Sequence, residues 1–330
     1  YNERAHIAET VRNKIGSDYP EERLRVLVVS DSSTDGTDEV LRDLEGPRVT
    51  WLRMERREGK TAALNEALSR VQDDIVVISD ANSMYERDAI RKIVENFDDS
   101  EVGYVTGRLL YERHGPSASG AGSSAYMRYE NLVRRLESNV GSVVGVNGGI
   151  DAVRRSLYER MRPDQLPDFV LPLRVVEKGF RVVYDPRAVC HEAALESSHD
   201  EYGMRVRVAL RALWALRDMR ALLNPVRQGF FAWQLWLHKA VRYAALILLV
   251  GTLFSNALLL ANRPVYGVLL TIQLVCYLAA AVGWILDRLG IDPGPLFAPY
   301  YFVLVNVAAA HAFVLFAMGR KRPTWTPRKG

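Results

Sequence analysis

Acidic side chains follow two of the short apolar runs near the start of the chain, where they could hold a cation or a polar ligand. Asp31 and Asp35 lie in the polar cluster after the run at 25–30, and Asp80 directly follows the run at 74–79. Ligands of open α/β sheets bind at the carboxyl ends of strands, so we expect these carboxylates to face one site. Asp80 and Asn82 offer the oxygen ligands that Mg²⁺ and Mn²⁺ prefer. Alternatively, these two residues form an Asx turn that caps the next helix.

The surrounding pattern alternates predicted strands with predicted helices. The run at 74–79 is apolar without alternation, which is typical of a strand buried on both faces. The pattern predicts an α/β sheet whose strands are linked by helices. A helix at 6–15 comes first, with no strand before it, so we expect the chain to lack the first strand of such a domain. The other predicted strands are 25–30, 49–54 and 181–184, and the other predicted helices are 37–44, 61–70, 84–96 and 169–178.

Six sequence blocks, in this order, resemble those of the family 2 glycosyltransferases, which are inverting enzymes of GT-A fold. They are YNE at 1–3, VVSDSSTDGT at 28–37, REGKTAALNEAL at 57–68, ISDANSMY at 78–85, GVNGGIDAVRR at 145–155 and LPDFVLPLRVVEKGFRVVYDP at 166–186. The resemblance covers residues 1 to about 220 and, more loosely, the later apolar segments, which are similar to those of membrane-bound polysaccharide synthases. It implies a Rossmann-like GT-A domain that transfers a hexosyl group from a UDP-sugar to a polysaccharide or lipid-linked acceptor.

The resemblance also implies the residues that bind the donor. Asp31 would accept a hydrogen bond from the N3–H of uracil, which matches donor to acceptor. A divalent cation, Mn²⁺ or Mg²⁺, would offset the charge of the donor diphosphate. Its expected ligands are Asp80, Asn82 and His191; many relatives have a second aspartate where this chain has Asn82. The full set of expected donor-binding residues is Tyr1, Glu3, Asp31, Lys60, Asp80 and Arg207.

Inversion requires a general base that takes the proton of the acceptor hydroxyl. Asp168 stands at the position that the family uses for this base, and Asp164 is the nearby alternative. A purely structural role for Asp168 would be the N-cap of the helix at 169–178. By the same resemblance, the acceptor loop contains Asn147, Gly148 and Gly149.

The family's processive members carry a Gln-x-x-Arg-Trp motif, which is incomplete in this chain. Arg207 matches the arginine, whereas Met204 and Val208 replace the glutamine and the tryptophan. The missing tryptophan, which would stack on a sugar, favours a second hypothesis: transfer of one sugar to a polyprenyl phosphate or another lipid. A third hypothesis, from a different class, is a nucleotide-regulated membrane scaffold or transporter without catalysis.

The distribution of charge divides the chain into four parts. Residues 1–220 form the predicted catalytic domain, 221–242 an amphipathic interfacial segment, 243–318 a transmembrane region and 319–330 a basic tail. Residues 243–318 contain three hydrophobic segments, 243–261, 265–286 and 297–318, each of about 20 residues and thus long enough to span a bilayer core of roughly 30 Å. The aromatic and basic side chains of 221–242 are typical of a helix in the headgroup layer. The only charged side chains of 243–318 are Arg263, Asp287, Arg288 and Asp292.

The basic residues beside the apolar region predict a multi-pass protein of the cell (inner) membrane with a cytoplasmic catalytic domain. The net charge is +4, but the excess of basic residues flanks the apolar region, and we therefore expect no nucleic-acid partner. Three crossings would put the basic tail on the side opposite the catalytic domain. Either one segment is interfacial or re-entrant, or the charge rule is broken.

Overall fold

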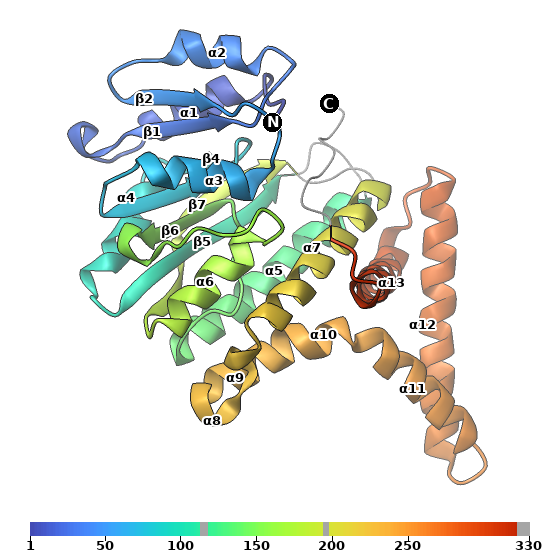
Figure 1. The fold of residues 1–330 in the computed structure, drawn as a ribbon. Coiled ribbons are helices and arrows are strands. Elements are labelled where there is room, and N and C mark those ends of the chain that lie inside the picture. The colour runs from blue at the N-terminus through green and yellow to red at the C-terminus, as the bar shows by residue number, and fades with distance from the viewer. Residues whose placement is uncertain (113–117, 194–197, 322–330) are drawn as a thin grey trace.

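The computed structural model describes residues 1–112, 118–193 and 198–321, and it has the α/β architecture expected from the sequence. Strands and helices of the first 220 residues form one body, and further helices extend from it (Figure 1). The strands are β1 (Val26–Ser30), β2 (Val49–Arg53), β3 (Ile75–Ser79), β4 (Met84–Tyr85), β5 (Val102–Glu112), β6 (Ile150–Arg154) and β7 (Arg181–Ala193). The helices of this body are α1 (Ile7–Ile15), α2 (Thr37–Leu44), α3 (Lys60–Arg70), α4 (Ala89–Glu95), α5 (Ala118–Val140), α6 (Pro167–Glu177) and α7 (Ser198–Asp218).

The strands form two sheets. Strands β1 and β2 pair in parallel, and a five-stranded sheet has the order β3-β6-β5-β7-β4. Strands β5 and β7 are parallel, whereas β6 lies antiparallel between β3 and β5. The sheet is therefore mixed, because the strand β6, which we did not predict, returns between two strands of the other direction.

One predicted helix boundary is wrong. The sequence predicts a helix at 84–96, but Met84 and Tyr85 form β4 and pair with His191 and Cys190 of β7. The Tyr85 hydroxyl is buried and donates to the carbonyl oxygen of Gly149 at 3.1 Å. These long-range contacts outweigh local helix propensity, and α4 begins only at Ala89.

One edge of each sheet borders the same cavity. In the described residues β1 pairs only with β2, and β3 pairs only with β6. Side chains of Val26–Val29 and Ile75–Ile78 line the cavity at these edges.

Burial sets the orientation of helix α6. Its residues Val170, Leu171, Leu173 and Val175 are fully buried in the core against β7. Pro167 occupies the first turn, where the missing N–H removes no hydrogen bond. The N-cap is Leu166, so the alternative role of Asp168 as the N-cap is wrong. Asp168 lies in the first turn, on the side of the helix away from the core.

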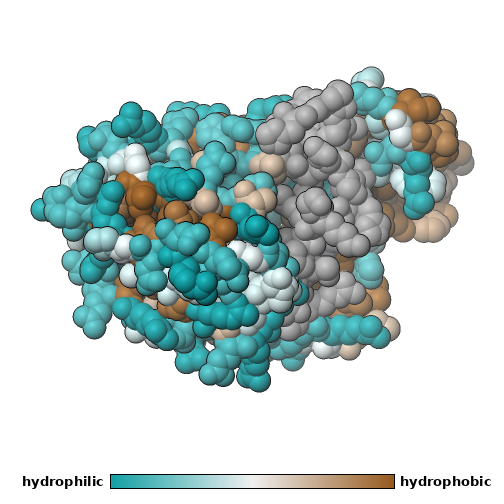
Figure 2. All heavy atoms as spheres, turned by 90° about the horizontal axis from the view of Figure 1, so that it is seen from above, coloured by the Kyte–Doolittle hydropathy of each residue, from teal (hydrophilic) through white to brown (hydrophobic). Residues whose placement is uncertain are grey.

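A series of helices follows the catalytic body. They are α8 (Pro225–Gln228), α9 (Phe230–Leu235), a π-helical turn (Trp236–Ala240), α10 (Val241–Tyr243), α11 (Ala245–Leu258), α12 (Pro264–Arg288) and α13 (Phe297–Ala317). Among the described residues, two helices, α12 and α13, are individually long and apolar enough to cross a membrane. Figure 2 shows apolar surface at the edge where α12 lies, and a mostly hydrophilic surface with smaller apolar areas over the sheets.

The first hydrophobic segment, 243–261, is not one straight helix. The stretch Phe230–Tyr243 and helix α11 meet at a bend of 68°, and they count as a third span only if the bent pair is one span. Helix α11 has 14 residues, about 21 Å at 1.5 Å per residue, which is short of the roughly 30 Å of a bilayer core.

Helix α13 packs on the catalytic body. Ala308 and Ala312 of α13 are buried against Leu210 of α7. The Tyr301 hydroxyl donates to Glu201 at 2.7 Å. In Figure 1, α13 lies beside α7 and is seen along its axis, whereas α12 stands at the outer edge of the molecule.

Candidate active site

The centre of the site is an ammonium group between two carboxylates. The Lys60 Nζ lies 2.6 Å from Asp80 Oδ1 and 3.2 Å from Asp168 Oδ1. Lys60 begins α3, Asp80 follows β3 and Asp168 lies in the first turn of α6, so three separate elements meet here. Burial would lower the pKa of Lys60, but the charges of Asp168 and Asp80 outweigh it and raise this pKa. The sequence predicted all three residues.

Asp31 positions the loop that leads to Lys60. Its two carboxylate oxygens accept hydrogen bonds from the backbone N–H groups of Glu58 and Gly59, both at 2.8 Å. Gly59 has a φ of 93°, a conformation that side chains other than glycine rarely adopt. Asp31 is buried at the wall of the site, and its expected hydrogen bond to uracil stays a prediction.

The chain's first residues lie against the loop after β1. The Glu3 N–H donates to the Thr37 hydroxyl at 3.0 Å, and the Arg4 N–H donates to Asp35 at 3.1 Å. The guanidinium of Arg57 lies 3.9 Å from the centre of the Tyr1 ring. Tyr1 and Glu3 therefore lie beside the Asp31 loop, and their role in donor binding stays a prediction.

A buried lysine forms a hydrogen bond to the turn from Asp80 to Ser83. Lys14 of α1 donates from Nζ to the Ser83 carbonyl, and its ammonium lies 3.5 Å from the centre of the Tyr85 ring. Burial lowers the pKa of Lys14 to about 7. Since β4 follows this turn and the N-cap of α4 is Asp88, the alternative that Asp80 and Asn82 cap the next helix is wrong.

The residues at this turn fit a hard cation that takes most of its ligands from the donor. Asp80 has a half-exposed carboxylate at the cleft, and Asn82 offers an amide oxygen. Mg²⁺ and its analogues are commonly bound through one or two carboxylates together with phosphate oxygens and water. Within the described ranges, no three His, Cys, Asp or Glu side chains form a group that could hold a metal ion alone.

His191, the third expected metal ligand, has other partners. Its Nδ1 lies 2.9 Å from a carboxylate oxygen of Glu112, and its Nε2 lies 3.6 Å from one of Glu86. It lines the same cleft as Asp80. Its role as a metal ligand stays a prediction.

The acceptor loop lies directly against Asp168. Gly148 has a φ of +84°, and a Cβ placed there would be 2.7 Å from an Asp168 carboxylate oxygen. Asn147 donates to the Gly107 carbonyl at 3.2 Å, and its buried Oδ1 has no partner among the described residues. A Cβ at Gly149 would be 2.8 Å from Glu192. Glycine is therefore required at 148 for the loop to approach the predicted base.

Asp151 supports this loop from the core. It is fully buried on β6 and accepts a hydrogen bond from the Gly148 N–H at 2.9 Å. Burial, together with the negative charge of Asp168, raises the pKa of Asp151 to about 7. Its other oxygen and the Thr106 hydroxyl have no hydrogen-bond partner in the described part of the chain.

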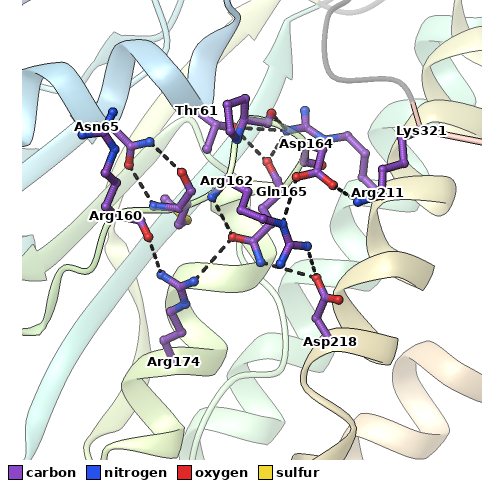
Figure 3. Close-up of polar contacts among 12 residues, drawn as sticks. Thr61, Asn65, Arg160, Arg162, Asp164, Gln165, Arg174, Arg211, Asp218 and Lys321 are labelled. Carbon is purple, nitrogen blue, oxygen red and sulfur yellow. Dashed lines mark hydrogen bonds and ion pairs between the residues drawn. The ribbon is translucent and has the colours of Figure 1, made fainter.

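The loop before α6 is held by a network of polar contacts (Figure 3). Arg211 of α7 donates to the Gln165 carbonyl and, at 3.1 Å, to the Thr61 hydroxyl of α3. Asn65 of α3 donates to the Met161 carbonyl at 2.7 Å. The loop is thus attached to both α3 and α7, which places Lys60 and Asp168 relative to each other.

Asp164 belongs to this network. Its carboxylate pairs with Arg162 at 3.2 Å and with Lys321, which follows α13. Burial favours the protonated acid, but hydrogen bonds from Lys321 and Arg162 hold the pKa of Asp164 below its ordinary value. Asp164 thus anchors the loop before α6, whereas Asp168 is the carboxylate that lies against the acceptor loop.

Except for Gly148 and Gly149, which are buried, all the predicted site residues line one open cleft of about 3150 Å³. Arg207 of α7 is among them, as are Asn147 and His191. Sequence reasoning missed Lys14, Asp151 and Arg211. Lys14 and Arg211 give no local signal, because their hydrogen-bond partners lie 69 and 46 residues away. Asp151 lies in the block at 145–155, but its complete burial, which raises its pKa, comes from the packing of the folded chain.

Comparison with known proteins identifies the class of enzyme. Residues 1–162 match the family model described as glycosyl transferase family 2. Residues 1–162 are thus a family 2 glycosyltransferase domain of GT-A-like fold, which confirms the family, the fold and the enzyme class predicted from the sequence.

Its relatives include polysaccharide synthases. The chain is 26% identical over 215 residues to the poly-β-1,6-N-acetyl-D-glucosamine synthase of Staphylococcus aureus (strain COL), covering 63% of this chain and 52% of the relative. It is 23% identical over 227 residues to the synthase of the same name from Staphylococcus epidermidis, covering 65% and 55%. The chain thus spans about half the length of these curated relatives.

A solved structure with the same fold is mannosyltransferase PcManGT from Pyrobaculum calidifontis, in complex with GDP-Man and Mn²⁺. It is 27% identical and superposes with a TM-score of 0.62, covering 87% of this chain and 85% of that one. The likeness thus extends beyond the residues that match the family model.

Replacing Gly148 by alanine will impair catalysis through a steric effect. The added methyl group meets the Asp168 carboxylate, so the loop or the base must move, and a displacement of about 1 Å can cost on the order of 100-fold in rate. The measurement is steady-state glycosyl transfer by the purified variant. Gly179→Ala is the matched control, because Gly179 also has a positive φ, +87°, but nothing within 4 Å of an added Cβ. Equal activity of the two variants would contradict the assigned contact.

Replacing Asp151 by asparagine will change how stability depends on pH. The pKa of Asp151 is raised in the folded protein, so the native state binds more protons than the unfolded state between about pH 4 and pH 7, and stability falls as pH rises through this range. Asparagine can still accept from Gly148 and does not ionise. The variant should therefore gain stability relative to the parent as pH rises, by roughly 4 kcal/mol at most. Parallel melting curves of the two proteins at all pH values would disprove the assignment.

Proposed function

We propose that the protein is a membrane-bound, metal-dependent inverting glycosyltransferase that transfers a sugar from a UDP-sugar to a polysaccharide or lipid-linked acceptor. The observation that carries the proposal is the meeting of Lys60, Asp80 and Asp168 beside the acceptor loop. The family and the related polysaccharide synthases support it.

Each group has a role that its position allows. A divalent cation at Asp80 and Asn82 would neutralise the donor diphosphate and the charge that develops on the leaving group. Asp31 reads the base, with Tyr1 and Glu3 beside it, and Lys60 and Arg207 add positive charge toward the diphosphate. Asp168 takes the proton of the acceptor hydroxyl as that oxygen attacks the anomeric carbon. The loop at 147–149 places the acceptor against Asp168.

Turnover of a donor panel tests the proposal. We expect the purified protein to release the nucleoside diphosphate from one UDP-sugar in the presence of Mn²⁺ or Mg²⁺ and to lose this activity in EDTA. The panel includes GDP-mannose, since PcManGT was solved with that donor. Asp168→Asn should lower transfer to the acceptor by 100-fold or more, in the range typical of a lost general base. Asp164→Asn, which removes an anchoring carboxylate, should cost less than about tenfold.

Two results would count against this mechanism. Full activity of Asp168→Asn would show that Asp168 is not the general base. Binding of UDP without turnover of any donor would favour a nucleotide-regulated membrane protein instead.

Transfer of a single sugar to a lipid phosphate is the second candidate. It is favoured by Met204 and Val208, which stand in α7 where processive relatives have glutamine and tryptophan. The length of the product separates the two: a ladder of polymer supports the first candidate, and one added sugar supports the second.

We also propose that the C-terminal tail and the catalytic domain lie on the same, cytoplasmic side of the cell membrane. Lys321 pairs with Asp164, and the Trp214 indole N–H donates to the Arg320 carbonyl at 2.9 Å. Both contacts join the chain after α13 to the catalytic body, which requires an even number of crossings between them. The first hydrophobic segment is then interfacial or re-entrant, in keeping with the bend before α11.

Cysteine labelling tests this topology. In a background of Cys190→Ala and Cys276→Ala, single cysteines at Arg56 in the catalytic domain and Lys329 in the tail should react with a membrane-impermeant maleimide from the same side of sealed vesicles. Labelling of Arg56→Cys and Lys329→Cys from opposite sides would mean an odd number of crossings. The positive-inside rule predicts the cytoplasmic side for both.

A further inference from the structure

A buried polar network joins α5 to the interfacial segment, here the stretch Phe230–Tyr243. Glu137 of α5 lies 2.7 Å from His238 Nδ1, and Glu130 pairs with Arg242 and, at 3.5 Å, with Arg134. Glu130 and Glu137 are almost fully buried. These contacts attach the interfacial segment to the catalytic body beside the acceptor loop.

The network contains one cationic side chain that forms no ion pair with its carboxylates. Arg134 and Arg242 both pair with Glu130, and Glu137 pairs with His238. Lys239 has no carboxylate within the 4.0 Å of an ion pair among the residues that the structure describes. Burial favours the protonated form of Glu130, but the nearby charge of Lys239, with His238 and the two arginines, holds the pKa of Glu130 well below its ordinary value. Lys239 thus contributes positive charge beyond that needed for pairing.

The Lys239 side chain points to the acceptor side of the cleft. A Cβ placed on Gly145 would lie 2.9 Å from Lys239 Cε and 3.0 Å from its Nζ. The same ammonium is 5.9 Å from the centre of the Phe169 ring. Gly145 lies three residues before Gly148, and Phe169 follows Asp168. The cation therefore lies against the chain that leads into the acceptor loop, and it lines the same cleft as Asp168.

The backbone around Lys239 is unusual. Residues Trp236–Ala240 form a π-helical turn between α9 and α10. Such turns are rare and occur frequently at functional sites. The extra residue in the turn changes the direction of the following side chains, and here His238 and Lys239 both point to the catalytic body.

The opposite face of the interfacial segment is apolar and exposed. Its most exposed large side chains are Phe230, Trp233, Trp236 and Leu237, from 43% to 66% exposed. Aromatic side chains of this kind favour the headgroup region of a bilayer. One short segment thus combines a face suited to lipid chains with a cation at the acceptor loop.

We propose that Lys239 binds the phosphate of a lipid-linked acceptor, whose hydrocarbon chain lies along the apolar face of the interfacial segment. A lysine ammonium with no paired carboxylate is a suitable partner for a phosphate monoester, which carries about −1.5 to −2 charges at neutral pH. The inference rests on the proposed glycosyl transfer and names the chemical class of its acceptor. Lys239 is a binding residue for the acceptor and takes no proton.

Equilibrium binding tests the inference without turnover. The full chain, in nanodiscs of neutral lipid, is titrated with farnesyl phosphate, farnesol, inorganic phosphate and UDP. Lys239→Met, which keeps the aliphatic stem against Gly145, should weaken farnesyl phosphate binding tenfold or more and leave farnesol and UDP binding unchanged. Lys239→Arg should restore binding to within about threefold. Arg227→Ala is the matched control, because Arg227 is an exposed cation of the adjacent helix α8 and should leave all four affinities unchanged.

Each contrary result has a definite meaning. Unchanged farnesyl phosphate binding by Lys239→Met overturns the inference. If Lys239→Met weakens UDP binding by the same factor, the lysine belongs to the donor site. If Arg227→Ala weakens farnesyl phosphate binding by the same factor, the effect comes from the positive charge near the membrane surface. Inorganic phosphate that binds as tightly as farnesyl phosphate shows a free-phosphate site. Absence of donor turnover would remove the proposed function but would not alter these affinities, so the two failures are distinguishable.

Discussion

The ion pairs of Lys60 are the interaction on which the site depends. Two carboxylates from distant parts of the chain, Asp80 and Asp168, lie within a few ångströms of each other, and without a cation between them they would repel. The Asp31 carboxylate holds the backbone just before Lys60 and so places the ammonium. A bound diphosphate would bring further negative charge, which is the physical reason why this arrangement also suits a divalent cation.

The supporting elements are attached to this centre by polar contacts from several directions. Arg211 links the loop before α6 to α3, and Asp151 holds the acceptor loop from the core. Lys321, which follows α13, pairs with Asp164 in the loop before α6. The helical part of the chain after residue 220 therefore contacts the cleft region through Lys321 and through Lys239. In the proposed function, this arrangement would place a site for a water-soluble donor beside the bilayer.

The sequence predicted the class of fold, and the charged residues that it singled out lie together in the folded chain, but some individual strands were missed. Lys60, Asp80 and Asp168 were expected from motif blocks, and the structure brings their charged groups together. The strand β6 and the short strand β4 were not predicted, because IDAVR and Met84–Tyr85 become strands only through pairing with β3, β5 and β7. Likewise, Asp164 was a plausible base by position alone, and its partners Arg162 and Lys321 become visible only in the folded chain.

The sequence by itself determined the class of enzyme, the position of its charged residues and the division into a polar domain and an apolar region, because motifs, composition and hydrophobic runs are local properties. The tertiary structure decided which charges neutralise one another, which carboxylate faces the acceptor loop and that Lys239 of the interfacial segment has no paired carboxylate among the described residues. Those outcomes depend on distances between residues far apart in the chain. Burial then sets the strength of each interaction, since a charge in the protein interior interacts more strongly than the same charge in water.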